Sequence, residues 1–373
     1  MRPAVVLSVV GARPNFMKVA PVLRQLARAP GFRSLLVHTG QHYDDAMSGV
    51  FLRELAMPAP DYQLEVGSGS HAAQTAVVMQ RFEHVCLEAR PDLVLVAGDV
   101  NSTLACALTA VKLDIPVAHL EAGLRSFDRR MPEEINRIVT DSIAALLFTT
   151  EASGNDNLQR EGVAPEQVHF VGNTMIDSLV LCRAALADTA VPNAPDHVLA
   201  TVHRPANVDA AERLDQVLDI LAAASEWAPV LFVTHPRTLA RLRHIATRPS
   251  LVVTDAVPAV PQRGRVYLLP PLPYLEFFRL MARSTAVLTD SGGVQEETTY
   301  LGVPCLTLRD NTERPSTVAL GTNELVGLDA ARVRECLDTI AGGRWKAASV
   351  PPLWDGHAAE RVVQVLNARF HPD

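Results

Sequence analysis

Short apolar runs alternate with helix-compatible stretches along nearly the whole chain. In the first half, these runs predict strands at residues 4–10, 34–39, 93–97, 116–120, 145–150 and 168–171. In the second half, they predict strands at residues 198–202, 230–234, 266–269, 286–289 and 304–308. Continuously hydrophobic strands separated by helices are typical of parallel sheets covered on both faces. Two such series predict an α/β protein with two Rossmann-like, doubly wound domains.

The stretch between the two series, residues 184–196, is rich in Ala, Pro and Asp and lacks a strand pattern, which predicts a linker. We therefore expect an N-terminal domain over residues 1–184 and a C-terminal domain over residues 185–356. Residues 357–373 contain an amphipathic helix, and the pattern leaves open whether it packs within the second domain or crosses back to the first. The Pro-rich residues 257–264 predict a loop.

The composition describes an ordinary soluble protein: 373 residues, 48% hydrophobic and 20% charged, with a net charge of −7. This charge gives no support to a nucleic-acid or anionic-membrane partner. No apolar run approaches the roughly 20 residues of a membrane helix, and the first run is too short for a signal peptide. The five scattered cysteines have apolar neighbours, which predicts buried thiols in a reducing cytoplasm.

The most informative segment is AVLTDSGGVQEE at residues 286–297, a buried strand that leads into a helix. Gly292 and Gly293 let the backbone approach a ligand closely, and the N–H groups of a helix start favour an anion. Glu297, one turn into the helix, can reach a ribose hydroxyl. The segment therefore predicts a nucleoside diphosphate site. A turn with a helix cap and no ligand is the alternative.

Polar residues also follow the other predicted strands. They occur at residues 11–14, 40–42, 98–102, 121–125, 203–204, 235–237 and 290–293. Ligands bind outside the carboxyl ends of strands in open α/β sheets. Two domains with such edges facing each other predict one central cleft.

Carboxylates are the strongest candidates for chemistry in the first domain. Asp99 and Glu121 follow apolar strands, where a charge is costly unless it faces a cleft. The alternative is a buried ion pair with one of three arginines, Arg125, Arg129 and Arg137. Glu133 begins a predicted helix, where the helix dipole alone favours an acid. Clustered carboxylates can raise one another's pKa, so that one acts as acid and its neighbour as base.

Basic residues stand where an anionic ligand would meet them. Arg13 and Lys18 flank the first strand-to-helix turn, and Arg314 follows a later strand, although ordinary solvated charge explains them equally well. His203 is the best single histidine for catalysis, and His235 occupies the matching position after the next strand.

Several cofactor motifs are absent from the sequence. Neither GxGxxG nor GxxxxGK[ST] occurs, so a dinucleotide cofactor and an ATP P-loop lose support. Neither CxxC nor HExxH occurs, and His38 and His42 straddle a strand end. We therefore expect no metal and no cofactor.

Taken together, the motifs resemble the bacterial, non-hydrolysing UDP-N-acetylglucosamine 2-epimerases. They include GARP at 11–14, TGQH at 39–42, HLEAGLR at 119–125, PEEINR at 132–137, TVHR at 201–204 and TERP at 312–315. The likeness runs from about residue 4 to residue 327 and also covers residues 98–99, 172–177, 235–236 and 289–297.

The resemblance implies a glycosyltransferase-B type fold and interconversion of UDP-GlcNAc and UDP-ManNAc without a nicotinamide cofactor, usually by a homodimer. By motif match, the family's catalytic positions fall on Asp99, Glu121, Glu133 and His203. Its UDP-binding positions fall on Arg13, Lys18, Ser291, Gly292, Gly293, Glu297 and Arg314. A possible allosteric site for a second nucleotide would include Gln41, Arg204 and His235.

The sequence departs from the family pattern at several points. Asn15 stands where many members have glutamate, and Pro205 and Ala206 replace polar residues. The loop that leads to Glu133 is shorter than in some members. Three other activities stay open: epimerisation of a modified UDP-hexosamine or uronic acid, hydrolytic release of ManNAc and UDP, and glycosyl transfer on the same fold. A non-enzymatic sensor of sugar nucleotides is a further alternative.

Overall fold

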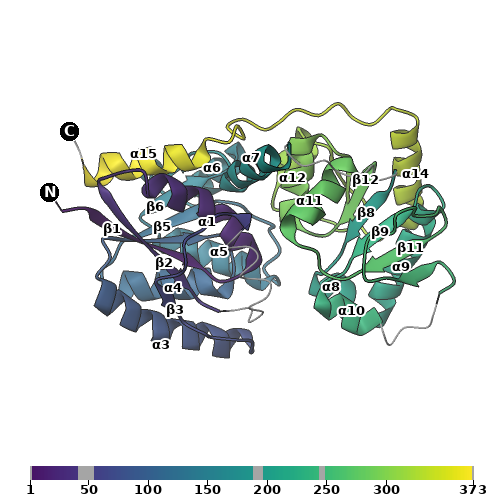
Figure 1. Ribbon diagram of the computed structural model, residues 1–373. Helices are drawn as coiled ribbons and strands as arrows, with labels where there is room; N and C mark the ends of the chain where they lie inside the picture. The colour runs from purple at the N-terminus through teal and green to yellow at the C-terminus, as the bar shows by residue number, and fades with distance from the viewer. Residues whose placement is uncertain (1, 41–53, 188–195, 243–247, 372–373) are drawn as a thin grey trace. The chain divides into compact units, whose positions relative to one another are not determined.

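The computed structural model describes residues 2–40, 54–187, 196–242 and 248–371 (Figure 1). The chain divides into two compact units, one formed by Met1–Ala185 with Pro352–Asp373 and the other by Leu186–Pro351. Each unit contains one parallel sheet of seven strands, which confirms the predicted α/β fold class. Most of the predicted linker, residues 188–195, lies outside the described residues.

The sheet of the first unit has the strand order β3-β2-β1-β4-β5-β6-β7. Its strands are β1 Ala4–Val10, β2 Phe32–His38, β3 Tyr62–Gln63, β4 Leu93–Ala97, β5 Val117–Ala122, β6 Leu146–Thr149 and β7 Val168–Phe170. The chain leaves β1 toward β2 on one side and later returns to β4 on the other side. This reversal creates a topological switch point between β1 and β4, where ligands bind in folds of this kind.

Helices cover both faces of this sheet (Figure 1). They are α1 Arg13–Leu26, α3 His71–Ala89, α4 Asn101–Lys112, α5 Pro132–Ile143, α6 Ala152–Arg160, α7 Thr174–Ala187, α15 Ala358–Phe370 and the 3-10 helix η1 Pro165–Gln167. Because side chains alternate along a strand, Val6 and Val10 pack toward α1 and α15, whereas Leu7 and Val9 pack toward α3 and α4.

The C-terminal residues complete the first unit. Helix α15 lies beside α1 (Figure 1), and its Val362 and Leu366 are fully buried in the same core as α1. Asp177 caps α15 by accepting hydrogen bonds from the backbone N–H groups of Ala358 and Ala359, at 3.1 and 2.7 Å.

This cap gives stability a dependence on pH. Burial raises the pKa of Asp177 to about 6, although the hydrogen bonds from Ala359 and Ala358 oppose the shift. The native state therefore holds a proton more tightly than the unfolded state does. As a result, the free energy of unfolding contributed by this group falls as the pH rises from about 4 to 6. Asp177→Asn should flatten this fall in denaturant titrations, and an unchanged pH profile would refute the assignment.

The second unit has the strand order β10-β11-β9-β8-β12-β13-β14. Its strands are β8 Val198–Thr201, β9 Val230–Val233, β10 Leu251–Val253, β11 Val266–Leu269, β12 Ala286–Thr289, β13 Cys305–Thr307 and β14 Asn323–Leu325. Its helices are α8 Pro205–Val208, α9 Ala211–Ser225, α10 Pro236–Leu242, α11 Tyr274–Arg283, α12 Gly292–Leu301, α13 Pro315–Ala319 and α14 Ala330–Ala341. The switch point of this sheet lies between β8 and β12.

All the predicted strands form, within two residues of their predicted ends, and residues 257–264 contain neither helix nor strand. The structure adds β3, β10 and β14, which have two or three residues each. Within the described residues, no helix is long and apolar enough to cross a membrane.

Candidate active site

Asp99 lies at the switch point of the first unit, two residues beyond the end of β4. Its side chain is 22% exposed and forms an ion pair with the guanidinium of Arg137 on α5. Its backbone carbonyl accepts a hydrogen bond of 2.9 Å from Asn136 Nδ2, on the same helix. Helix α5 therefore fixes both the backbone and the carboxylate of Asp99. The ion pair with Arg137 is one of the alternatives that the sequence left open.

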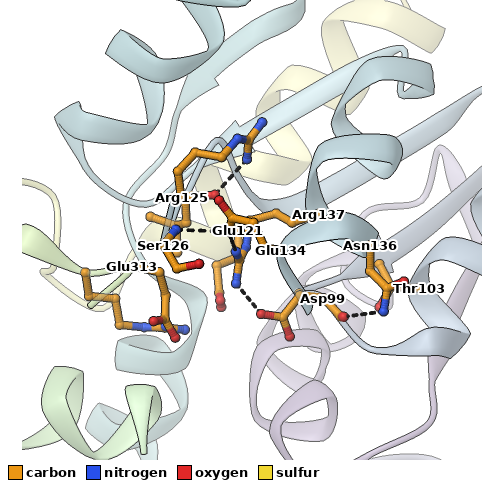
Figure 2. A network of polar contacts seen from close by, with 12 residues as sticks. Asp99, Thr103, Glu121, Arg125, Ser126, Glu134, Asn136, Arg137 and Glu313 are labelled. Carbon is orange, nitrogen blue, oxygen red and sulfur yellow. Dashed lines mark hydrogen bonds and ion pairs between the residues drawn. The ribbon is translucent and has the colours of Figure 1, made fainter. Parts of the chain in front are cut away.

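Arg137 links Asp99 to a second carboxylate. Figure 2 shows its guanidinium between Asp99 and Glu134, and its NH1 atom lies 2.6 Å from Glu134 Oε2. Glu134 also accepts the backbone N–H groups of Ser126 and Phe127, each at 2.9 Å. The structure thus places Glu134 in the buried network, whereas its neighbour Glu133, the predicted catalytic residue, is half-buried.

Glu121 occupies a strained position near the end of β5. Its φ of 68° lies in the left-handed region, and the pairing of β5 with β6 shifts register between Leu120 and Ala122. Such backbone strain costs of order 1–3 kcal/mol and clusters at functional sites. Glu121 Oε2 lies 2.5 Å from Lys18 Nζ, and both side chains are buried. Lys18, a predicted UDP ligand, thus contacts a predicted catalytic carboxylate in this structure.

Gly98 and Asn15 shape this edge of the sheet. A Cβ on Gly98 would lie 2.8 Å from Lys18 Nζ, so the glycine makes room for the ammonium group. Asn15 is buried and donates a hydrogen bond of 2.6 Å to the carbonyl of Ala97. It therefore supports the end of β4 directly. Arg13 opens α1 beside it, and Gln41 and His42 lie outside the described residues.

In the second unit, Asp290 ties the ends of β8 and β12 together. Its fully buried carboxylate accepts the backbone N–H groups of His203 and Arg204, at 3.1 and 2.9 Å. It also accepts Asn207 Nδ2 at 3.0 Å. Pro205 begins the short helix α8 that brings Asn207 to this position. Asp290 is absent from the predicted site residues, although its place at a strand end is the signal that identified Asp99.

His203 lies at the solvent-exposed side of the residues that contact Asp290. Its ring is 42% exposed, and Nδ1 lies 3.5 Å from Asp290 Oδ1. The ring centroid of the exposed His235 is 6.1 Å away. The structure therefore brings the two predicted histidines together at the ends of neighbouring strands, with Arg204 as the next residue in the chain.

The start of α12 is built around a buried arginine. Ser291 is the N-cap residue, and the helix begins at Gly292 and Gly293. A Cβ on Gly292 would lie 2.4 Å from Arg314 NH1, so Arg314 occupies the space that this glycine leaves open. Arg314 pairs with Glu296 at 2.8 Å and with Glu313 at 2.7 Å. The guanidinium and the free N–H groups of the helix start thus lie side by side.

Glu313 forms ion pairs with two further guanidinium groups. Its carboxylate contacts Arg204 NH2 at 3.1 Å and Arg309 NH2 at 2.8 Å, in addition to Arg314. Three guanidinium groups thus face two buried carboxylates, Glu313 and Glu296, and their N–H groups can also bind an anionic ligand.

Glu297 is held by a residue that the sequence reasoning missed. Tyr274, the first residue of α11, donates a hydrogen bond of 2.7 Å from its hydroxyl to Glu297 Oε1. Both side chains are buried, so the carboxylate has a fixed orientation one turn into α12. A tyrosine directly after the helix-capping Pro273 is the only sequence signal for this contact.

Both switch points therefore carry reactive groups. The first unit holds carboxylates beside cations, which suits proton transfer. The second holds a cationic helix start beside an oriented carboxylate, which suits a diphosphate joined to a ribose.

A crystal structure of UDP-GlcNAc 2-epimerase from Neisseria meningitidis bound to UDP-GlcNAc is similar to this chain, with a TM-score of 0.85 and 30% sequence identity. The similarity covers 97% of this chain and 99% of that chain. Fold and sites define an α/β protein of the glycosyltransferase-B type.

Sequence comparisons narrow this class. A sequence model of the family described as UDP-N-acetylglucosamine 2-epimerase matches residues 24–367. The UDP-N-acetylglucosamine 2-epimerase of Methanocaldococcus jannaschii is 39% identical over 372 residues, 96% of this chain and 97% of that protein. The UDP-2,3-diacetamido-2,3-dideoxy-D-glucuronate 2-epimerase of Pseudomonas aeruginosa is 40% identical over 341 residues, 90% of this chain and 92% of that protein. The chain belongs to the UDP-N-acetylglucosamine 2-epimerase family. Relatives of this chain include archaeal as well as bacterial proteins, so the comparisons support the family but do not restrict the resemblance to its bacterial members.

Proposed function

We propose that this protein is a non-hydrolysing 2-epimerase that interconverts UDP-GlcNAc and UDP-ManNAc. The observation that carries the proposal is the start of α12, where Gly292 leaves space for the buried guanidinium of Arg314. The named activity of the Methanocaldococcus jannaschii relative agrees with it.

UDP would bind mainly to the second unit. The diphosphate would meet Arg314 and the N–H groups that follow Ser291, because charge-assisted hydrogen bonds to phosphate are strong. Glu297, oriented by Tyr274, would accept hydrogen bonds from the ribose hydroxyls. Arg13 and Lys18 would supply further positive charge from the first unit.

The reaction requires more than removal and return of a proton. The proton on C2 is not next to a carbonyl, so a base removes it as the bond from C1 to the UDP oxygen breaks. The electron pair forms a C1–C2 double bond, which gives 2-acetamidoglucal and free UDP. UDP then adds back to C1 while an acid delivers a proton to the opposite face of C2.

Two faces of C2 require two acid–base groups. We propose that these come from Asp99, Glu121, Glu133 and His203. The contacts of Asp99 with Arg137 and of Glu121 with Lys18 hold two of these carboxylates in place. Arg314 and the start of α12 would stabilise the charge that develops on the departing diphosphate.

A second candidate is epimerisation of a UDP-diacetamido-uronic acid. The 40% identity to the Pseudomonas aeruginosa enzyme favours it specifically. That substrate replaces a hydroxyl by an acetamido group and carries an additional carboxylate, so it would need an extra cationic contact near the sugar.

Incubation with each nucleotide sugar separately, followed by proton NMR, distinguishes these candidates. The proposal predicts a stable mixture of UDP-GlcNAc and UDP-ManNAc with no net loss of nucleotide sugar. Turnover of the uronate alone would establish the second candidate. Release of free ManNAc and UDP would indicate a hydrolysing enzyme, and no reaction of either sugar would reject both epimerase readings.

We further propose a cytoplasmic homodimer. A cavity of about 420 Å³ opens among α3, α4 and α5, and its lining combines apolar side chains such as Met79 and the 40% exposed Ile135 with the polar His71, Asn101 and Asn136. Burial of such a surface favours association. Light scattering should give twice the chain mass, and a monomer mass would contradict the dimer.

The cytoplasmic location rests on the cysteines. All five are buried thiols, which suits a reducing compartment.

A further inference from the structure

His119 and Asp141 form a buried pair that the proposed reaction does not use directly. His119 lies within β5 and is fully buried. Its Nε2 atom lies 2.8 Å from the carbonyl oxygen of Gly98, and its Nδ1 atom lies 2.6 Å from Asp141 Oδ1. A carbonyl oxygen only accepts hydrogen bonds, so Nε2 carries a proton. An ionised carboxylate also only accepts, so the two hydrogen bonds together require a proton on each ring nitrogen.

Other contacts of Asp141 support its ionised state. Its Oδ2 atom accepts the backbone N–H of Gly123 at 3.0 Å and lies 2.7 Å from Arg125 NH1. Burial by itself would raise the pKa of Asp141, but the charges of His119 and Arg125 and their hydrogen bonds bring it below its ordinary value. Arg125 is anchored in turn by two hydrogen bonds to Glu161, at 2.8 and 2.6 Å.

The pair joins the two strand ends that carry the candidate carboxylates. Gly98, bonded to His119, directly precedes Asp99 at the end of β4. Gly123, bonded to Asp141, follows Glu121 by two residues at the end of β5. The hydrogen bonds therefore connect Gly98, β5, α5 and Gly123 in one continuous path through the buried interior.

Glu121 is held in an uncommon conformation on this path, with a φ of 68°. Gly98 and Gly123 also have positive φ values, 66° and 78°, which glycine adopts readily. A non-glycine residue keeps such a conformation only when its surroundings determine it. The bonds from His119 and Asp141 hold the backbone on both sides of the bulge in β5, while Lys18 holds the side chain of Glu121.

We propose that His119 and Asp141 are positioning residues that fix Asp99 and Glu121 relative to each other for the epimerisation. The proposal rests on the proposed function, since the spacing matters only if both carboxylates act on one sugar. Neither His119 nor Asp141 needs to touch the substrate. Their effect should therefore fall on kcat and leave the affinity for the nucleotide unchanged.

A pair of substitutions at Asp141 tests this role. Asp141→Ala removes both bonds, and because a displacement of about 1 Å can slow an enzyme about 100-fold, kcat should fall by about 10- to 100-fold. KM should stay at its wild-type value. Asp141→Asn is the matched control, because its amide nitrogen can donate to Nδ1 of a neutral His119 while its oxygen still accepts from Gly123. It should restore kcat close to wild type.

The protonation of His119 provides a readout that does not depend on activity. Nitrogen-15 NMR at neutral pH, with the signal assigned by its absence from His119→Gln, should show both ring nitrogens protonated in the wild type. In Asp141→Asn, one nitrogen should be unprotonated. An unprotonated ring nitrogen in the wild type would contradict the proposed hydrogen bonds of His119. This measurement uses the wild-type protein, so it remains informative even if Asp141→Ala fails to fold.

The outcomes separate the two proposals. If the wild type epimerises neither nucleotide sugar, the proposed function fails, and the NMR spectrum still decides whether the charged pair exists. If the wild type is active and a folded Asp141→Ala keeps wild-type kcat, the positioning role is wrong. Equal loss in Asp141→Ala and Asp141→Asn would also overturn it, because the amide retains the positioning bonds.

Discussion

Asp99→Asn should lower kcat by about 10²- to 10⁴-fold, the range expected for loss of a general acid or base, while UDP still binds. The amide has nearly the shape of the carboxylate and can still accept from Arg137, so the end of β4 should keep its geometry. It cannot take a proton from C2 or return one. Turnover followed by NMR gives kcat, and calorimetric titration with UDP gives the affinity.

Asp114→Asn is the matched control for this substitution. Asp114 is exposed in the turn between α4 and β5, with a φ of 57° that asparagine adopts readily. The same chemical change there should leave kcat and UDP affinity at wild-type values. Wild-type kcat in Asp99→Asn would remove Asp99 from the mechanism, and loss of UDP binding would show that its role is structural.

Gly292→Ala should weaken UDP binding by about 10- to 100-fold. The added methyl group would lie 2.4 Å from Arg314 NH1 and 3.0 Å from Glu313 Oε1, so the guanidinium must leave its place beside the start of α12. Loss of a hydrogen bond between charged groups costs about 1.5–3 kcal/mol, and each 1.4 kcal/mol is about a tenfold change in affinity. Calorimetric titration with UDP measures the effect directly.

Gly69→Ala controls for the loss of a glycine. The nearest atom to a Cβ at Gly69 is Ala73 Cβ at 3.9 Å, an ordinary contact, so UDP affinity should not change. If Gly292→Ala binds UDP as tightly as the wild type, the diphosphate does not depend on Arg314 at the start of α12, and the proposed binding mode is wrong.

Much of the fold could be predicted because buried parallel strands are continuous apolar runs. Residues 4–10, 93–97, 266–269 and 286–289 form strands with the predicted bounds. The strands that were missed, β3, β10 and β14, lie at sheet edges and have only two or three residues. An edge strand pairs on one side only, so little of its sequence must be apolar.

The site could be predicted only in part, because strand ends are visible in the sequence and long-range contacts are not. Asp99 and Glu121 were found as charges that follow apolar strands. Helix α5 shows what was missed: Glu134, Arg137 and Asp141 are buried, whereas its apolar Ile135 is 40% exposed. This reversed pattern in PEEINRIVTD is a signal for a polar interior. It does not reveal that Asp141 contacts His119, 22 residues earlier in the chain.

In the proposed reaction, UDP leaves and returns while the proton on C2 exchanges with solvent. Incubation of the protein with UDP-GlcNAc in D2O, followed by proton NMR and mass spectrometry, tests it most directly. We expect UDP-ManNAc to appear with deuterium at C2 and recovered UDP-GlcNAc to gain the same label. UDP-ManNAc that keeps its original C2 proton, or the absence of any epimer, would contradict this mechanism.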